Sequence, residues 1–208
     1  MPQTSSGETV YAAPDAADTY VQSDANTFSL STQGSPSEWT QFLEKRQVQA
    51  KARIDEFCGR DFEDHASDTV TLDGGARGKR ILYLPSPVRS VSEVRIDGEA
   101  LAASTYRAKP SGQLIRLGTD GSEARWPAGY GNIAIDLDWG YQTPPADIAE
   151  AEQKLVAHTV ANLAQLREGQ VVQQDDVDLK VNLPSAMTAE VRGILRAHRD
   201  SGRTMGLL

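Results

Sequence analysis

The chain has 208 residues, a net charge of -8 and a mean hydropathy of -0.45. This length suffices for one domain with an insertion or for two small domains, and no segment approaches the ~20 consecutive apolar residues of a membrane span. The acidic charge argues against binding of nucleic acid, because an acidic surface does not condense onto phosphates.

Residues 1–34 form an N-terminal arm that is rich in small and polar residues and has little to bury. Alone, such a segment is expected to be mostly disordered. Within it, residues 14–21 predict a short helix, with a proline at the first position and acids in the first turn. The arm is either a floppy leader or a segment that orders only against a neighbouring subunit, and we favour the second. The candidate subunit-interface residues are its isolated apolar side chains, Tyr11, Tyr20, Phe28 and Leu30.

A long helix is predicted next, with Ser35 as its cap, Pro36 in its first turn and Glu38 completing a capping box. Gly59 is expected to end it. Cys58, the single cysteine, is interpreted as a small buried hydrophobe rather than a nucleophile. The apolar residues that recur at helical spacing are Trp39, Leu43, Ala50, Ile54 and Phe57.

Between residues 60 and 141 the hydrophobic period changes to two, which is typical of half-buried strands. Asp97 and Gly98 indicate a hairpin turn. The last strand places Ile133, Ile135, Leu137 and Trp139 on one face, and Ala134, Asp136 and Asp138 on the other. Short strands separated by turns favour an antiparallel sandwich or small barrel. The predicted strands are 69–72, 80–84, 88–96, 106–108, 114–117 and 133–139.

A second long helix is predicted over 146–169, with Pro145 as its first residue. A short strand is expected at 177–181 and a last helix from Pro184, in which Val191, Ile194 and Leu195 are apolar. The apolar stripe expected on the second long helix is Ile148, Ala151, Leu155, Thr159, Leu163 and Leu166, with Val156 and Val160 beside it.

The expected fold class is therefore α+β, a helical bundle with an inserted antiparallel β-sandwich or small barrel. The predicted domains are an extended arm (1–34), a helical bundle (35–60 and 145–200), an inserted β domain (61–144) and a C-terminal tail (201–208).

The residues offer little chemistry. The three histidines, His65, His158 and His198, lack metal-ligand spacing. Residues 74–80 are one residue too short for a phosphate loop, so a hairpin turn is preferred. Asp136 and Asp138 fit a surface face better than a glycosidase pair. We therefore expect no catalytic residue, no metal and no cofactor, and no enzyme activity.

Several ordered motifs carry a resemblance to a known family. They are residues 54–62 at the end of the first helix, 82–98, Tyr106, 112–116, Trp126-Pro127, Trp139-Gly140-Tyr141 and 144–151. This set resembles the head–tail connector (adaptor) proteins of tailed bacteriophages and archaeal tailed viruses, in the subtype with a β insertion in a helical bundle. The resemblance spans roughly residues 35–199.

The resemblance implies a structural virion protein of the neck, assembled in the host cytoplasm. Twelve copies would form a ring beneath the portal protein, extend the DNA channel used in genome ejection, and receive the next neck or tail-completion protein. Double-stranded DNA would pass without specific binding, and no membrane would be involved. The ratio of six Lys to fifteen Arg fits a halophilic archaeal host or a GC-rich genome.

The C-terminal tail is the predicted portal-binding segment, because its apolar residues have no periodic partner in the chain. Its candidate residues are Arg203, Thr204, Met205, Leu207 and Leu208. A disordered end is the alternative.

Other functions remain open. A neck stopper or tail-completion protein would share the β-rich middle but lack the two long helices. A virion glycan-binding β module would need an aromatic patch, and its only candidates are Tyr83, Tyr106, Trp126 and Tyr130. A small hydrolase is the enzyme alternative, and the missing pair of nucleophile and base disfavours it.

Overall fold

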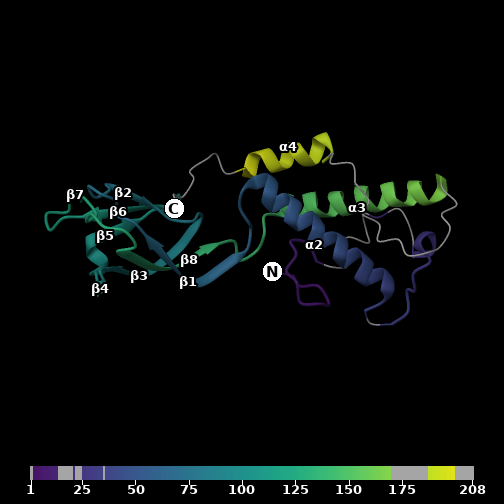
Figure 1. The fold of residues 1–208 in the computed structure, drawn as a ribbon, viewed down its shortest axis with the longest axis horizontal. Coiled ribbons are helices and arrows are strands. Elements are labelled where there is room, and N and C mark those ends of the chain that lie inside the picture. Colours follow the sequence, from purple (N-terminus) through teal and green to yellow (C-terminus); the bar gives the residue numbers. More distant parts are fainter. Residues whose placement is uncertain (1, 14–20, 22–24, 35, 170–186, 200–208) are drawn as a thin grey trace. The chain divides into compact units, whose positions relative to one another are not determined.

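A computed structural model describes the chain except residues 1, 14–20, 22–24, 35, 170–186 and 200–208 (Figure 1). Three helices pack together, and two small antiparallel sheets of four strands are inserted between the first and the second of them. The predicted α+β fold class is therefore confirmed. The chain divides into a helical unit, Met1–Phe62 with Pro144–Ser201, and a β unit built on Glu63–Thr143, where the sequence predicts an insertion over 61–144.

Helix α2 spans Glu38–Cys58 and is capped by Ser37, whose Oγ accepts the Thr40 N–H at 3.1 Å. The predicted cap at Ser35 is wrong, because the hydroxyl that reaches the first turn is that of Ser37, the residue directly before the helix. Glu38 accepts the Ser31 N–H instead of closing a capping box. The predicted stop is confirmed: Gly59 follows the helix in a left-handed conformation (φ 70°).

Helices α3 (Ala146–Gly169) and α4 (Ala189–His198) pack on each other, and both contact α2. The predicted bounds of α3, 146–169, are confirmed. Pro145 lies directly before the helix rather than at its first position, and its carbonyl accepts the Ile148 and Ala149 N–H groups. Thr188 caps α4, although the sequence predicts a start at Pro184. Residue 184 and the predicted strand at 177–181 lie outside the described residues. No described helix combines the length and apolar character of a membrane span.

The buried face of α3 differs from the predicted stripe. Thr159 and Leu163 are only half-buried, whereas Val160, which is predicted beside the stripe, and Ala164 are buried. The face broadens because α3 packs against two helices rather than one. Its buried residues are Ile148, Ala151, Glu152, Leu155, Val156, Val160 and Ala164.

The β unit contains two antiparallel sheets. Strand order in the first is β1 (Asp64–Leu72), β8 (Ile133–Gly140), β3 (Val88–Ile96), β4 (Glu99–Ala100). In the second, β6 (Gln113–Leu117) pairs with β2 (Ile81–Tyr83), β5 (Tyr106–Ala108) and β7 (Glu123–Ala124). Strands β3 and β5 have their predicted bounds, and β4 and β7 are strands that the sequence does not predict. The hairpin at Asp97-Gly98 is confirmed, with φ of 51° and 85°.

One hydrophobic core lies between the two sheets. Its side chains come from both, for example Ile135 of β8 and Leu114 of β6, together with Trp126. The predicted alternation of β8 is confirmed, because Ile133, Ile135 and Leu137 are at most 1% exposed. The inserted unit is therefore a small sandwich.

The glycine-rich loop 74–80 is not the predicted hairpin turn, since β1 and β2 belong to different sheets. Instead Gly75 and Gly129 exchange backbone hydrogen bonds of 2.8 and 3.0 Å. A Cβ on Gly74 would lie 1.8 Å from the Pro127 carbonyl oxygen, so this close approach requires glycine.

Candidate functional site

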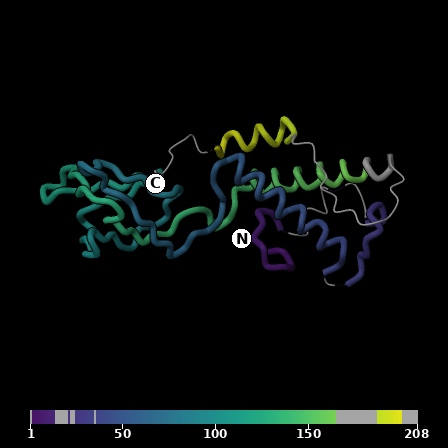
Figure 2. Tube along the Cα trace, in the orientation of Figure 1, coloured from purple at the N-terminus to yellow at the C-terminus, as the bar shows by residue number. Residues whose placement is uncertain are grey.

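The N-terminal arm folds back on itself before it reaches the helices (Figure 2). Thr4 donates its N–H to the Glu8 carbonyl, Val10 donates to the Pro2 carbonyl, and Gly7 makes the turn with φ of 85°. The next three residues, Val10, Tyr11 and Ala12, are at most 3% exposed. A sequence with little to bury thus buries its one compact apolar stretch.

Five side chains or backbone groups hold this arm, and we call them the arm site: Glu44, Gln47, Asp55, Phe62 and Glu152. Glu44 accepts the Ser5 N–H at 2.8 Å and the Ser5 hydroxyl at 2.5 Å. The amide of Gln47 donates to the Ala13 carbonyl at 3.2 Å. Helices α2 and α3 both contribute, because Glu152 lies on α3.

Glu152 is the centre of the arm site. Its side chain is fully buried, and its two oxygens accept the N–H groups of Tyr11 at 3.2 Å and Ala12 at 2.6 Å. Burial raises the pKa of this carboxyl to about 7, against the opposing effect of the two N–H donors and of Lys51. The carboxyl therefore changes charge near neutral pH while it binds the arm.

The Tyr11 side chain closes the other end of the site. Its hydroxyl donates to Asp55 and accepts the buried Phe62 N–H at 3.0 Å, and its ring packs edge-on against Phe62. Burial and the neighbouring Asp55 raise the pKa of Tyr11, and burial raises the pKa of Asp55, whose carboxylate also accepts a bond from Lys51 at 2.8 Å. Tyr11 is thus a specific anchor rather than a loose apolar contact.

These contacts correct one prediction. Tyr11 and Phe28 need no neighbouring subunit to be buried, because both are buried against helices of their own chain. Phe28, in the short helix η1 (Ala25–Phe28), stacks on Trp39 and contacts Phe42. Leu30 is half-buried. The fourth candidate, Tyr20, lies outside the described residues.

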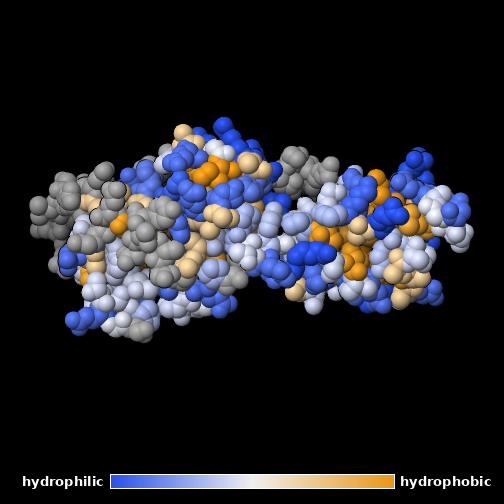
Figure 3. Space-filling model, turned by 180° about the vertical axis from the view of Figure 1, so that it is seen from behind, coloured by the Kyte–Doolittle hydropathy of each residue, from blue (hydrophilic) through white to orange (hydrophobic). Residues whose placement is uncertain are grey.

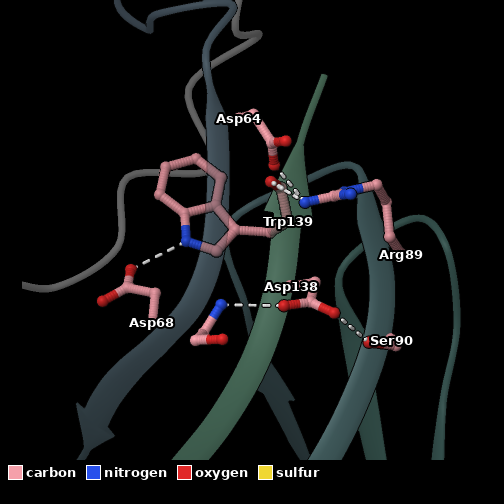
Figure 4. Close-up of polar contacts among 7 residues, drawn as sticks. Asp64, Asp68, Arg89, Ser90, Asp138 and Trp139 are labelled. Carbon is pink, nitrogen blue, oxygen red and sulfur yellow. Dashed lines mark hydrogen bonds and ion pairs between the residues drawn. The ribbon is translucent and has the colours of Figure 1, made fainter. Parts of the chain in front are cut away.

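A polar cluster in the β unit is the second candidate (Figure 4). The pairing register of β8 shifts between His65 and Asp68 on β1, and again between Val88 and Ser90 on β3. Asp138 bridges both irregularities, since it accepts the Ser67 N–H and the Ser90 hydroxyl, each at 2.8 Å. The pKa of Asp138 is lowered, first by the Ser67 N–H and then by Ser90.

This cluster stabilises the sheet and does not form a catalytic pair. Both Asp138 oxygens accept hydrogen bonds, and Asp136 accepts from Thr69 and Arg95, each at 2.8 Å. The lowered pKa of Asp138 is also the opposite of what a general acid needs. Beside them, Trp139 donates its indole N–H to Asp68 at 2.8 Å, and Arg89 pairs with Asp64.

The four aromatic residues predicted for a glycan patch do not form one. Trp126 is 1% exposed and donates its indole N–H to the Leu114 carbonyl inside the core. Tyr106 is half-buried against the same core, while Tyr83 is 45% and Tyr130 76% exposed. On the face drawn in Figure 3, apolar patches lie among polar residues over both units. The four residues therefore form no aromatic platform for a glycan, because Trp126 is a core residue.

Other predicted site residues are placed as follows. Cys58 is fully buried beside the Leu195 carbonyl, and burial raises its thiol pKa to about 11, so it is a packed residue as predicted. Among the described residues, no group of three or more His, Cys, Asp or Glu side chains could hold a metal. The five portal-binding candidates, Arg203, Thr204, Met205, Leu207 and Leu208, lie outside the described residues.

Sequence reasoning missed the arm site, although the sequence carries a signal for it. Glu152 falls midway between Ile148 and Val156 at steps of four, and Gln47 falls between Leu43 and Ala50. Polar residues on an apolar stripe are expected to have buried partners. No protein-family model matches this chain, and a search of curated proteins also finds no match.

Proposed function

We propose that this protein is a head–tail adaptor of a tailed virus, which forms a ring beneath the portal and extends the DNA channel to the next neck or tail protein. The observation that supports this most is the order of the two units along the chain. A small β-sandwich is inserted between two long helices that pack on each other, and the motifs of the family resemblance fall on both units.

The charge of the chain suits this role. With a net charge of -8, most of a ring surface would repel DNA phosphates rather than bind them. A channel for passing DNA needs this property, because bound phosphates would have to be released at every step. A chain that gripped DNA would instead be basic.

The structure disfavours the two other virion roles. A neck stopper would lack the two long helices, whereas α2 has 21 residues and α3 has 24. A glycan-binding module would need an exposed aromatic platform, and Trp126 is buried. The absence of enzyme activity remains a prediction.

Native mass spectrometry of the full chain, alone and with the portal protein of the same genome, tests the proposal. We expect a closed ring of about twelve copies that binds portal rings through a cyclic interface. A chain that stays monomeric in both samples would rule the adaptor role out. A chain that assembles but binds only a tail component would favour the tail-completion alternative.

The predicted portal contact has its own test. Truncation after residue 200 removes the apolar tail, whose few side chains contribute about 1.5–3 kcal/mol each when buried. We expect the truncated chain to fold and to lose co-sedimentation with portal rings, since a weak contact repeated around a ring depends on avidity. Undiminished co-sedimentation would move the docking surface to another part of the chain.

A further inference from the structure

We propose that a cluster of cations in the β unit binds the phosphate backbone of nucleic acid without reading its sequence. The cluster lies where loop 74–80 leads into β2 and where the chain leaves β7. This inference goes beyond the proposed ring and does not depend on it, because the cluster belongs to a single chain. We call it the basic cluster, and its members are Arg77, Lys79, Arg80, Arg116 and Arg125.

Hydrogen bonds join the three segments that carry these cations. The Arg125 guanidinium donates to the Gly78 carbonyl at 3.2 Å, and the Arg116 guanidinium donates to the Arg125 carbonyl at 3.1 Å. The Trp126 N–H donates to the Lys79 carbonyl at 2.8 Å. A Cβ on Gly78 would lie 2.3 Å from the Trp126 carbonyl oxygen, so this close approach of the loop requires glycine. The positive charges are therefore gathered at one place in the sandwich.

The chain itself supplies no counter-charge to the basic cluster. None of its members forms an ion pair in the described part of the chain, whereas Arg89 and Arg95 on the first sheet pair with carboxylates. Of the acids close by in the sequence, Asp73 accepts a backbone N–H and Asp120 accepts a serine hydroxyl. Glu123 on β7 is exposed, and no ion pair joins it to the described cations. Like charges held close together repel, and an anion from outside the chain would offset this repulsion.

The acidic net charge of the chain does not prevent such a contact. At physiological ionic strength, charges more than about 8 Å apart are largely screened from each other. An approaching anion therefore responds mainly to the cations nearest to it, and Arg77, Lys79, Arg80 and Arg125 are exposed. The net charge of -8 argues against a general affinity for nucleic acid, but it leaves room for a local contact.

The surroundings of the basic cluster favour nucleic acid over an acidic protein. All members but Lys79 are arginines, whose planar guanidinium binds phosphate oxygens in pairs. The backbone pairing of Gly75 with Gly129 brings Tyr130 next to loop 74–80, and this tyrosine is 76% exposed. A tyrosine hydroxyl binds phosphate oxygens, and an exposed ring stacks on bases. An acidic peptide would use the cations but would leave the exposed ring without a matching partner.

Fluorescence anisotropy of a labelled DNA duplex of about 30 base pairs tests the proposal. The full chain is titrated into the duplex at NaCl concentrations from about 25 to about 200 mM, where phosphate contacts are sensitive to salt. The test variant combines Arg77→Gln and Lys79→Gln in the exposed loop. The matched control combines Lys45→Gln and Arg196→Gln, which removes the same two charges from exposed positions of the helical unit.

The affinity of the wild type should fall steeply with salt, with a log–log slope of about -0.9 for each phosphate contacted. The test variant should reduce the magnitude of this slope by about 2 and weaken binding at the lowest salt about ten-fold or more, while the control keeps the wild-type slope. No binding at the lowest salt, or equal losses in the two variants, would overturn the proposal. Displacement of the duplex by polyglutamate at equal charge concentration would also overturn it, and would indicate an acidic protein as the partner.

A second measurement needs no variant. Acetylation of amines on the full chain, followed by mass spectrometry, reports the accessibility of Lys79 in the basic cluster and of Lys45 on α2 in the same sample. The DNA duplex should slow the acetylation of Lys79 several-fold and leave that of Lys45 unchanged. Equal acetylation of Lys79 with and without DNA would contradict the assignment of the phosphate contact to this cluster.

Discussion

The buried carboxyl of Glu152 predicts a specific loss of stability as pH rises. The folded protein raises its pKa from 4.5 to about 7, mainly by burial. Because the folded state holds this proton more tightly than the unfolded state, the stabilising effect is complete below pH ~4.5 and is lost as pH rises to about 7. A difference of roughly 2.5 in pKa corresponds to about 3 kcal/mol, at ~1.4 kcal/mol for each pH unit.

Glu152→Gln removes this titration while it keeps the shape of the side chain. We expect the free energy of unfolding of the wild type to fall, relative to the variant, by about 3 kcal/mol between pH 4.5 and 7.5. At pH 8 the variant also faces the Ala12 N–H with an amide that offers one acceptor instead of two, which costs about 1–3 kcal/mol. The pH slope, rather than the stability at one pH, is therefore the diagnostic quantity.

Urea unfolding at constant ionic strength, followed by circular dichroism at half-unit pH steps, measures the slope. The control is Glu150→Gln, two residues earlier on α3, where the carboxylate is 44% exposed and pairs with Lys154. Such a surface pair contributes little, so its loss should leave the slope close to that of the wild type. Parallel curves for the wild type and Glu152→Gln would show that Glu152 stays in one charge state, and would refute the argument.

Three further substitutions test the packing of the helical unit. Tyr11→Phe should lower the free energy of unfolding by about 1–3 kcal/mol, because the buried Phe62 N–H loses its acceptor, and urea denaturation would show a change in midpoint without a change in slope. Leu155→Ala should cost about 2–5 kcal/mol at a side chain that is 3% exposed, and Leu163→Ala should cost distinctly less at its half-buried position. Equal costs for the two leucines would contradict the buried face of α3 described above.

The periodic elements of this fold could be predicted from the sequence, because their signals are local. The alternation of β8, the turn at Asp97-Gly98 and the helix stop at Gly59 each depend on a few neighbouring residues. The division of the strands into two sheets could not be predicted in the same way. No local pattern around loop 74–80 indicates that Gly75 pairs with Gly129, more than fifty residues further along the chain.

The arm site lay beyond sequence reasoning for a related reason. Its central contact joins Glu152 to Ala12 across 140 residues, so no local pattern connects the two ends. A polar arm with few apolar residues is typical of disorder. Only the helices that it contacts show that burial of Val10, Tyr11 and Ala12 suffices to dock it. Buried polar residues on helix stripes are the signal to search for in similar chains.

The β unit should fold as an independent module. Its two ends meet: Tyr141 donates its N–H to the Glu63 carbonyl at 2.8 Å, and Asp64 is paired with Gly140 in the first sheet. A cut at residues 68–141 would remove part of the insertion but leave the first residues of β1 behind. Boundaries at 63 and 143 keep the whole strand and the sandwich core intact.

Two complementary chains test this: residues 63–143 alone, and the remainder with residue 62 joined to 144 by a short Gly-Ser linker. The β chain should unfold cooperatively in urea, with a slope of about 1 kcal/mol per molar, and with the fluorescence of Trp126 and Trp139 reporting the loss of the core. The joined chain should keep its helical circular dichroism, because the contacts among α2, α3 and α4 need no residue of the insertion. Loss of the helical signal in the joined chain, together with a non-cooperative β chain, would mean that each unit needs the other to fold.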